Sequence, residues 1–346
     1  MAASKHFISD NASGVHPEVL EALVRANDGH AVAYGNDAWT ARTQEVLRGH
    51  FGAQCEVLFA LTGTGANVLA LHSLLQSWQA IICADSSHLH RDECGAAEKF
   101  IGCKVLTAHT PDGKLTPDVI EPLIEDTRMV HRAQPRVVTV SQCTEWGTIY
   151  TPAELAALAE FCRTHRLLLH VDGARLCNAA VALDTTLRAL TADCGVDVLS
   201  FGGTKNGLMG AEAVVFFDPA LAQSAPFYRK QAMQLASKMR FVAAQFEALL
   251  GGDLWQRNAF HANTMAARLT AAIEDIDGLK IVMPVESNAV FARIPPLSVA
   301  PLQDYAAFVV WRSAQSIVRW MTSFDTTEDD VDAFAREIRR VIRDGR

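Results

Sequence analysis

Short apolar runs alternate with helix-patterned segments through the first two thirds of the chain, and this alternation restricts the fold more than any other feature. Seven runs predict strands, at residues 56–61, 80–84, 103–107, 136–140, 167–171, 197–201 and 212–217. Several of them are apolar at almost every position, which is typical of strands covered on both faces. The sequence therefore predicts an α/β fold with a mostly parallel seven-stranded sheet and helices on both of its faces.

The last hundred residues follow a different pattern. They predict a helix over 253–276, short strands at 281–283 and 289–294, a further strand over 311–321, and a last helix capped by Thr326-Thr327-Glu328 that ends near Arg343. A chain of 346 residues is long for one compact unit. We therefore expect an N-terminal segment plus a large domain over 1–248 and a small C-terminal α+β domain over 249–346.

Charge and cysteine content narrow the class of protein. The net charge is −8 and no block of Lys or Arg stands out, so nucleic acid and anionic membrane are not expected as partners. Eight cysteines occur without a Cys-x-x-Cys pair, which is typical of free thiols in a reducing compartment. Residues 1–7 lack the apolar core of a signal peptide, and no apolar run reaches the roughly 20 residues that span a bilayer. We expect a cytoplasmic protein.

Two predicted strands end in residues with matching chemistry. Lys205 lies in the glycine-rich segment Ser200-Phe201-Gly202-Gly203-Thr204-Lys205-Asn206-Gly207, which extends from the end of the predicted strand 197–201. Asp172 stands at the end of the predicted strand 167–171. Alone, Asp172 would be interpreted as a turn residue and Lys205 as a surface lysine. Together, with one strand between them, they suit pyridoxal phosphate, because a lysine forms the Schiff base and a carboxylate keeps the pyridine nitrogen protonated.

A third turn has the composition of an anion site. In Thr62-Gly63-Thr64-Gly65-Ala66-Asn67, glycines let the backbone approach a ligand, and the amides of the following helix can bind a phosphate. An ordinary strand–helix turn explains this segment equally well. A dinucleotide fold and a nucleotide P-loop are disfavoured, since position 68 is valine and no Gly-Lys-Thr follows.

Several other polar side chains are candidates for the same site. His88 follows a strand, where an imidazole can stack on a flat ring and move protons. A metal site built from alternating His88, His90 and Asp92 is disfavoured because the segment leads into a helix and no second cluster completes the ligand shell. The forked guanidinium groups of Arg175 and Arg319 suit a substrate carboxylate. Ser9 and Asp10 can join them only if the N-terminal segment folds back over the site.

These residues resemble those of the low-specificity threonine aldolases, also called phenylserine or β-hydroxy-amino-acid aldolases, among the fold type I pyridoxal phosphate enzymes. The resemblance extends from Phe7 to about Arg240 and is thinner beyond. It is carried by Ser9-Asp10, Tyr34-Gly35-Asn36-Asp37, residues 62–67, His88, residues 170–175, the Lys205 segment, Met239-Arg240 and Ile317-Val318-Arg319.

The resemblance implies a role for each matching residue and an oligomer with shared sites. It implies a homodimer or homotetramer in which Lys205 forms the Schiff base, Asp172 faces the ring nitrogen and His88 stacks on the ring. Gly63 and Thr64 would bind the phosphate together with Arg240 from across a subunit boundary. Ser9, Arg175 and Arg319 would bind the substrate carboxylate, and Tyr34 would approach the site from a neighbouring chain. The implied reaction is retro-aldol cleavage of threonine, allo-threonine or phenylserine to glycine and an aldehyde.

Two departures from the family pattern affect the site. Many relatives have Asn-Thr-His-Asn where this chain has Cys143-Thr144-Glu145-Trp146, so Glu145 stands at the second histidine, and Ile8 stands where an arginine is usual. His88 is our first candidate for the base that deprotonates the β-hydroxyl, and Glu145 is the second. β-Elimination or transamination on the same cofactor and a non-catalytic cofactor-binding protein remain alternatives, while the glycine pattern disfavours a dehydrogenase.

Overall fold

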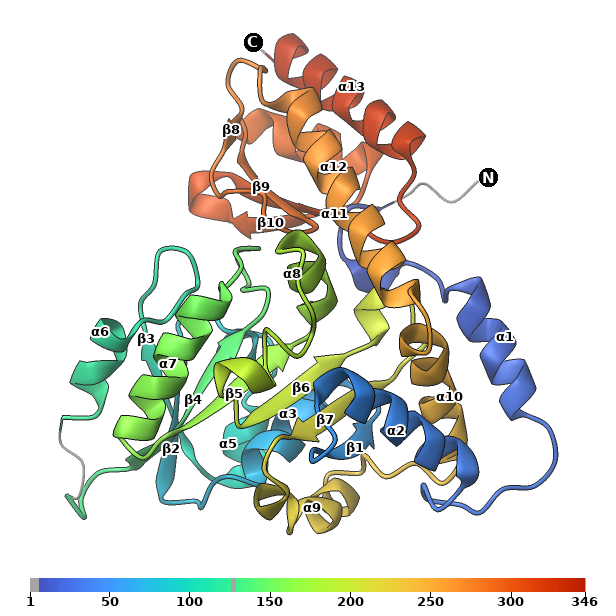
Figure 1. Ribbon diagram of the computed structural model, residues 1–346. Helices are drawn as coiled ribbons and strands as arrows, with labels where there is room; N and C mark the ends of the chain where they lie inside the picture. Colours follow the sequence, from blue (N-terminus) through green and yellow to red (C-terminus); the bar gives the residue numbers. More distant parts are fainter. Residues whose placement is uncertain (1–5, 126–128, 346) are drawn as a thin grey trace.

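Two β-sheets, one large and one small, organise the chain in the computed structural model, which describes residues 6–125 and 129–345 (Figure 1). The strands of the large sheet are β1 (Glu56–Ala60), β2 (Gln79–Ala84), β3 (Lys104–Ala108), β4 (Gln134–Ser141), β5 (Leu168–Gly173), β6 (Val198–Gly202) and β7 (Glu212–Phe216). Each strand predicted in this part of the chain is confirmed to within two residues.

The strand order of the large sheet is β1-β7-β6-β5-β4-β2-β3. The pairs from β3 to β6 are parallel, whereas β7 runs antiparallel to both of its neighbours, β6 and β1. The predicted mostly parallel sheet is thus confirmed. As a consequence, the carboxyl ends of six strands and the amino end of β7 meet at one edge.

Helices cover both faces of this sheet, which explains why its central strands are mostly apolar. Val137 packs into the cluster on one face and its neighbour Val138 into the cluster on the other, because successive strand side chains alternate. The helices of the Val137 face are α3 (Gly63–His72), α5 (Ala96–Ile101) and α9 (Ala225–Gln231). Those of the Val138 face are α2 (Ala38–Phe51), α7 (Pro152–Thr164), α8 (Leu176–Ala182) and α10 (Met239–Leu250). The remaining helices of this part are α1 (Pro17–Ala26), α4 (His88–Arg91) and α6 (Pro117–Ile120).

The small sheet is antiparallel and has the order β10-β11-β9-β8. Its elements are β8 (Lys280–Ile281), β9 (Ala289–Arg293), α12 (Val299–Tyr305), β10 (Val309–Arg312), β11 (Ile317–Met321) and α13 (Glu328–Asp344), together with α11 (Leu254–Ile273). The single strand predicted over 311–321 is wrong. A 3₁₀ turn at Ser313–Gln315 and the left-handed Ser316 (φ 50°) reverse the chain and produce a hairpin. The predicted cap of α13 is confirmed, since the Thr327 hydroxyl accepts the Asp330 N–H.

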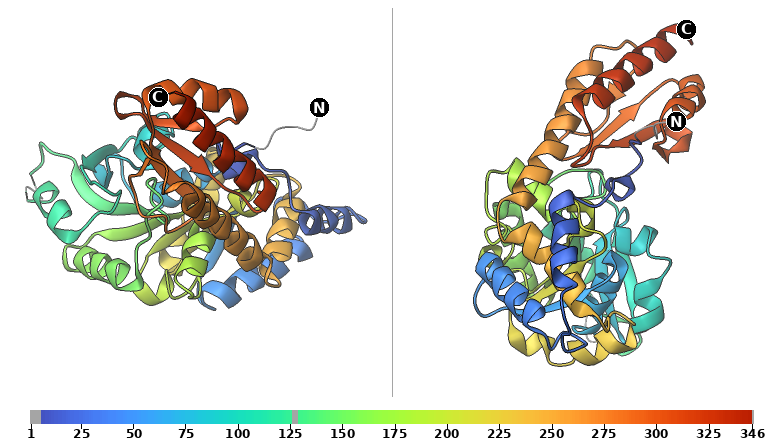
Figure 2. Two further views of the ribbon diagram at one scale, coloured as in Figure 1. Left: turned by 90° about the horizontal axis from the view of Figure 1, so that it is seen from above. Right: turned by 90° about the vertical axis from the view of Figure 1, so that its right-hand side faces the viewer.

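Two segments connect the sheets. The first turns of α11 pack in the large core through Leu254 and Ala259, and its later turns pack in the small core through Leu269 and Ile273 (Figures 1 and 2). The N-terminal segment joins the small sheet, where Phe7 stacks on Phe334 with ring centres 4.4 Å apart. The division between residues 248 and 249 falls inside the last turn of α10 and stays a prediction.

Two properties of the described residues concern membrane-spanning helices and the state of the cysteines. None of their helices combines the length and hydropathy that a membrane-spanning segment needs. All eight cysteines have free thiols; Cys94 is exposed and the other seven are buried. The buried thiols therefore serve as small apolar side chains of the core.

Candidate active site

The carboxyl edge of the large sheet is hollowed by two adjoining cavities. The Asp172 cavity measures about 300 Å³ and is lined by residues that include Ser9, Glu145, Asp172, Arg175 and Arg319. The Glu212 cavity measures about 350 Å³ and is lined by residues that include Thr62, Gly63, Thr64, Thr204 and Glu212. Asn11, His88, Ala174 and Lys205 line both. Together the cavities have the size of a small-molecule site.

Lys205 and Asp172 come together here, as the sequence predicts. Lys205 lies in the 3₁₀ turn Thr204–Asn206 that follows β6, while Asp172 lies in the neighbouring strand β5. Burial and the nearby Arg175 lower the pKa of the Lys205 amine, which favours its nucleophilic form. Burial alone would raise the pKa of Asp172, but His88, Lys205 and a hydrogen bond from Asn67 lower it overall. The site therefore pairs a reactive amine with an ionised carboxylate.

The turn after β1 presents the start of a helix to the Glu212 cavity. The Thr62 hydroxyl accepts the Gly65 N–H at 3.1 Å, whereas the N–H groups of Gly63 and Thr64 precede the first intrahelical bond of α3 and have no acceptor in the helix. A Cβ on Gly63 would meet nothing within 4 Å, whereas one on Gly65 would lie 2.3 Å from the Gln234 side chain. The open space at Gly63 suits an anion at the helix start, and this favours the phosphate interpretation over an ordinary turn.

A buried polar bridge connects Asp172 with His88. The Asn67 side-chain amide donates to Asp172 Oδ2 and to Glu93 Oε1, both at 2.8 Å, and His88 Nδ1 lies 2.8 Å from the same Glu93 oxygen. This hydrogen bond to Glu93 raises the pKa of His88 although burial opposes the shift. His88, Glu93 and Asp172 each offer a ligand atom within 4.8 Å of the others. The Asn67 amide donates hydrogen bonds to Glu93 and Asp172, so we attribute the close approach of these three side chains to hydrogen bonds and not to a metal ion.

Glu145 lies beside His88 in the Asp172 cavity. Its Oε1 accepts the backbone N–H of His88 at 2.7 Å and the Ser141 hydroxyl at 2.6 Å. Burial raises the pKa of this carboxyl. Glu145 therefore positions the start of α4, and its raised pKa would also let it exchange a proton.

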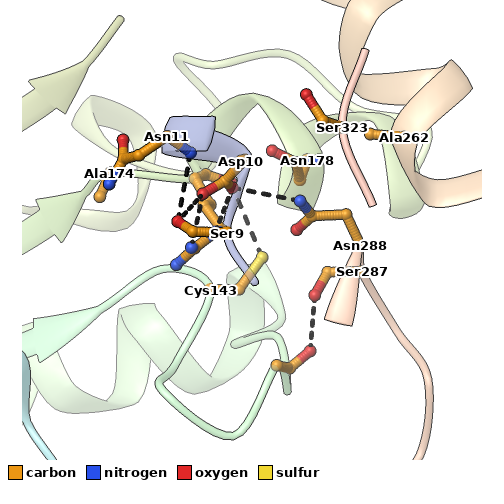
Figure 3. A network of polar contacts seen from close by, with 12 residues as sticks. Ser9, Asp10, Asn11, Cys143, Ala174, Asn178, Ala262, Ser287, Asn288 and Ser323 are labelled. Carbon is orange, nitrogen blue, oxygen red and sulfur yellow. Dashed lines mark hydrogen bonds and ion pairs between the residues drawn. The ribbon is translucent and has the colours of Figure 1, made fainter. Parts of the chain in front are cut away.

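The N-terminal segment does fold back over the site. Arg175 donates to Asp10 through Nε at 2.7 Å and Nη2 at 2.9 Å. Asn288, next to the start of β9, donates to the same carboxylate at 3.2 Å (Figure 3). Burial would raise the pKa of Asp10, but its contacts with Arg175 lower it overall, so the carboxyl is ionised. This arrangement brings Ser9 to the cavity and fixes Arg175, whose Nη1 makes no hydrogen bond with any residue that the structure describes.

Arg319, in β11, lines the same cavity and contacts the N-terminal segment. Its guanidinium carbon is 5.2 Å from the centre of the Trp311 ring, and Nη2 donates to the Ile8 carbonyl at 3.2 Å. Its Nε is buried with no hydrogen-bond partner among the described residues. Burial and the nearby Arg175 lower the pKa of Arg319 to about 10. An anion bound between the two guanidinium groups would give Arg319 Nε a hydrogen-bond partner and would offset the repulsion between the two positive charges.

Comparison with known proteins identifies the family. The model of the Beta-eliminating lyase family matches residues 6–295. Two proteins named low specificity L-threonine aldolase, from a Pseudomonas species and from Pseudomonas aeruginosa, are each 44% identical over 98% of this chain and 98% of their own.

The chain belongs to the low-specificity threonine aldolase family.

Solved structures agree with this assignment. A threonine aldolase from Leishmania major superposes with a TM-score of 0.91 at 32% identity, covering 97% of this chain and 99% of its own. Mouse CSAD shares the fold alone, with a TM-score of 0.76 at 16% identity over 98% of this chain and 84% of its own. The predicted fold type I architecture is therefore confirmed.

The residues present fit pyridoxal phosphate, on which the enzymes of the threonine aldolase family depend. Lys205 and Asp172 line one cavity, the start of α3 opens on the adjoining one, and the unpartnered Nε of Arg319 is available to an anion. His88 lines both cavities and can face a ring bound between them. The chemistry of this set matches an aldehyde cofactor that carries a phosphate and a basic ring nitrogen.

Two residues that the family resemblance implicates lie outside the cavities of their own chain. Tyr34 is exposed, and its N–H donates to the Ser237 carbonyl. Arg240 donates to the carbonyls of Asp28 and Gly29 at 3.3 and 3.1 Å. The segments that hold Tyr34 and Arg240 are therefore adjacent, on a surface away from the site.

The sequence analysis missed three polar residues of the site: Asn67, Glu93 and Glu212. Asn67 ends the glycine-rich turn and Glu93 follows His88 by five residues, so both lay inside segments already singled out. Glu212 is an acidic residue at the start of an otherwise apolar strand, and that contrast is a signal that sequence reasoning can use.

Proposed function

We propose that this chain is a pyridoxal-phosphate-dependent aldolase that cleaves β-hydroxy-α-amino acids of the threonine, allo-threonine and phenylserine type to glycine and an aldehyde. The observation that carries the proposal is the placement of Lys205 and Asp172 in one cavity that Arg319 also lines. The 44% identity to proteins named low specificity L-threonine aldolase supports the reaction type.

Five residues would hold the cofactor. Lys205 would bind it covalently through Nζ, Asp172 would face the ring nitrogen, and the amides of Gly63 and Thr64 would bind the phosphate. His88, fixed by Glu93, would cover one face of the ring. When bound, pyridoxal phosphate supplies an aldehyde that condenses with amines and a conjugated ring that takes up electrons from a bond at Cα.

Two arginines and a serine would hold the substrate carboxylate. Arg175 offers the amino group that Asp10 leaves free, Arg319 offers its unpartnered Nε, and Ser9 lines the cavity between them. Fixing the carboxylate at this end fixes rotation about the bond from nitrogen to Cα. These residues would therefore hold the Cα–Cβ bond perpendicular to the ring plane, and this orientation favours cleavage of that bond.

His88 is the base that we propose for the β-hydroxyl proton. Its Nδ1 is engaged by Glu93, so Nε2 is the nitrogen left to accept a proton. Glu145 is the second candidate, because its carboxyl lines the same cavity and burial raises its pKa. His88→Ala should abolish aldol cleavage, and Glu145→Gln should reduce it less. The reverse order of effects would assign the base to Glu145.

A second copy of the chain would complete the site. Tyr34 and Arg240 lie away from their own cavities, and Val32 next to them is 66% exposed, which supports an interface at this surface. Mixing inactive Lys205→Ala and Arg240→Ala subunits tests this proposal. In a dimer with shared sites, random reassociation should restore about a quarter of the wild-type activity. No recovery after confirmed subunit exchange would refute the sharing.

Product analysis tests the reaction itself. The purified holoenzyme, given threonine and phenylserine, should release glycine and the matching aldehyde in equal amounts. Pyruvate or another 2-oxo acid with ammonia would indicate β-elimination, the reaction for which the matching family model is named. Binding of the cofactor without turnover of either substrate would indicate a non-catalytic protein. We also propose a cytoplasmic location, which the free cysteines support.

A further inference from the structure

A buried carboxyl group that the proposed reaction does not use lies at the phosphate end of the site. Glu212 begins β7 and is paired in register with Ala60 at the end of β1 and with Gly202 at the end of β6. The turn with Gly63 follows β1, and the turn with Lys205 follows β6. Glu212 therefore lies between these two turns and lines the cavity into which both open.

The hydrogen bonds of Glu212 accommodate both of its protonation states. Its Oε2 accepts the Gly203 N–H at 3.1 Å, and its Oε1 lies 2.6 Å from Thr204 Oγ1, which also accepts the Ala211 N–H. In the ionised state the Thr204 hydroxyl donates to Oε1. If Oε1 is protonated, the direction of that bond reverses, and the Thr204 hydrogen becomes available to an acceptor in the cavity, which Thr204 also lines.

The charges around Glu212 are few. Among the described residues that line its cavity, the other ionisable side chains are Lys205 and His88, while Asp172 acts from the adjoining cavity. Burial raises the pKa of Glu212 to about 7, and Asp172 adds to this shift. The Thr204 and Gly203 hydrogen bonds and the positive charge of Lys205 oppose it. A carboxyl balanced in this way responds to any further negative charge that enters the cavity.

We propose that Glu212 takes up a proton when the cofactor phosphate binds, so that the affinity of the enzyme for pyridoxal phosphate falls as the pH rises. A phosphate dianion and a carboxylate in one buried cavity repel each other, and protonation of the carboxyl removes this repulsion. Protonation also frees the Thr204 hydroxyl to donate to the phosphate. The proposal rests on the proposed function, because it takes the phosphate to lie at the start of α3.

Titration of the full-length apoprotein with pyridoxal phosphate tests this proposal. The dissociation constants of wild type and Glu212→Gln are compared from about pH 6.5 to about 8.5 by protein fluorescence. Their ratio cancels the ionisation of the cofactor itself, whereas the pKa of Lys205, which the Glu212 charge raises, differs between the two proteins. We expect the wild-type constant to rise relative to that of the variant by about tenfold for each pH unit above 7. Glu56→Gln, on the adjacent strand β1 and half-exposed, is the matched control and should follow wild type.

A constant ratio across this range would overturn the proposal. Difference infrared spectra of wild-type protein with ¹³C-labelled glutamate keep the test independent of the variant's folding. Addition of pyridoxal phosphate at about pH 8 should produce the C=O band of a protonated glutamate carboxyl, and no such band would also overturn it. Tight binding without either effect refutes this proposal alone, whereas no binding at any pH refutes the proposed function.

Discussion

Removing the charge of Asp10 should destabilise the protein far more than removing the charge of an equally well-bonded surface aspartate. Asp10 and Arg175 form a bidentate pair at 2.7 and 2.9 Å, with side chains only 1% and 16% exposed. Asp10→Asn leaves the Arg175 guanidinium buried without its counter-charge, and breaking such a pair costs about 3–5 kcal/mol. An unfolding entropy of about 0.7 kcal/mol/K for 346 residues converts this cost to a fall in Tm of about 4–7 °C.

A surface pair with the same geometry provides the control. Arg268 donates to Asp332 through two bonds of 2.8 Å, but these side chains are 38% and 37% exposed, and Glu328 also contacts Arg268 at 3.0 Å. Water screens this pair, so Asp332→Asn should cost less than about 1 kcal/mol, or about 1.5 °C.

Calorimetry of both variants at equal protein concentration provides the comparison, and it should be repeated at low pH. The Asp10 contribution is present above its unfolded pKa of 3.8 and is lost as the pH falls through its lower folded pKa. The Asp10→Asn deficit should therefore shrink in acid. Equal falls in Tm for the two substitutions at neutral pH would refute the argument that burial makes the loss of the Asp10 charge more destabilising.

Three further predictions test other contacts. Glu93→Gln removes the hydrogen bond that raises the pKa of His88, so the acid limb of the kcat/KM profile should move to lower pH; an unchanged limb contradicts the base assignment. Asp172→Asn should keep the cofactor bound, seen by absorbance, yet lose turnover about hundredfold or more; full activity contradicts its role beside the ring nitrogen. Gly65→Ala should cost about 1–3 kcal/mol in urea unfolding, because its Cβ would displace the Gln234 side chain, whose Oε1 accepts the Leu61 N–H at 2.9 Å, whereas Gly63→Ala should be neutral; similar costs contradict the packing argument.

The large sheet could be predicted because most of its strands are buried on both faces and therefore form apolar runs between turn residues, although the edge strand β3 is partly exposed. The hairpin at 309–321 could not be predicted, because the chain reversal depends on the left-handed conformation of Ser316. Serine rarely adopts this conformation, so the residue type gives no indication of it. Lys205 and Asp172 could be predicted because parallel strands bring their carboxyl ends to one edge.

The contacts that complete the site depend on residues far apart in sequence. Asp10 meets Arg175 across 165 residues, and Asn67 meets Asp172 across 105. Neither local pattern nor composition contains that information. At Ile8, where the family resemblance leads us to expect an arginine, the backbone carbonyl accepts a hydrogen bond from the Arg319 guanidinium, and this contact requires no particular side chain at position 8.

The covalent attachment point of the cofactor tests the central claim most directly. Borohydride reduction of the holoenzyme followed by peptide mass spectrometry should place the pyridoxyl group on Lys205, and Lys205→Ala should carry none. A label on any other lysine, or an unlabelled wild-type protein that still cleaves its substrate, would contradict the account.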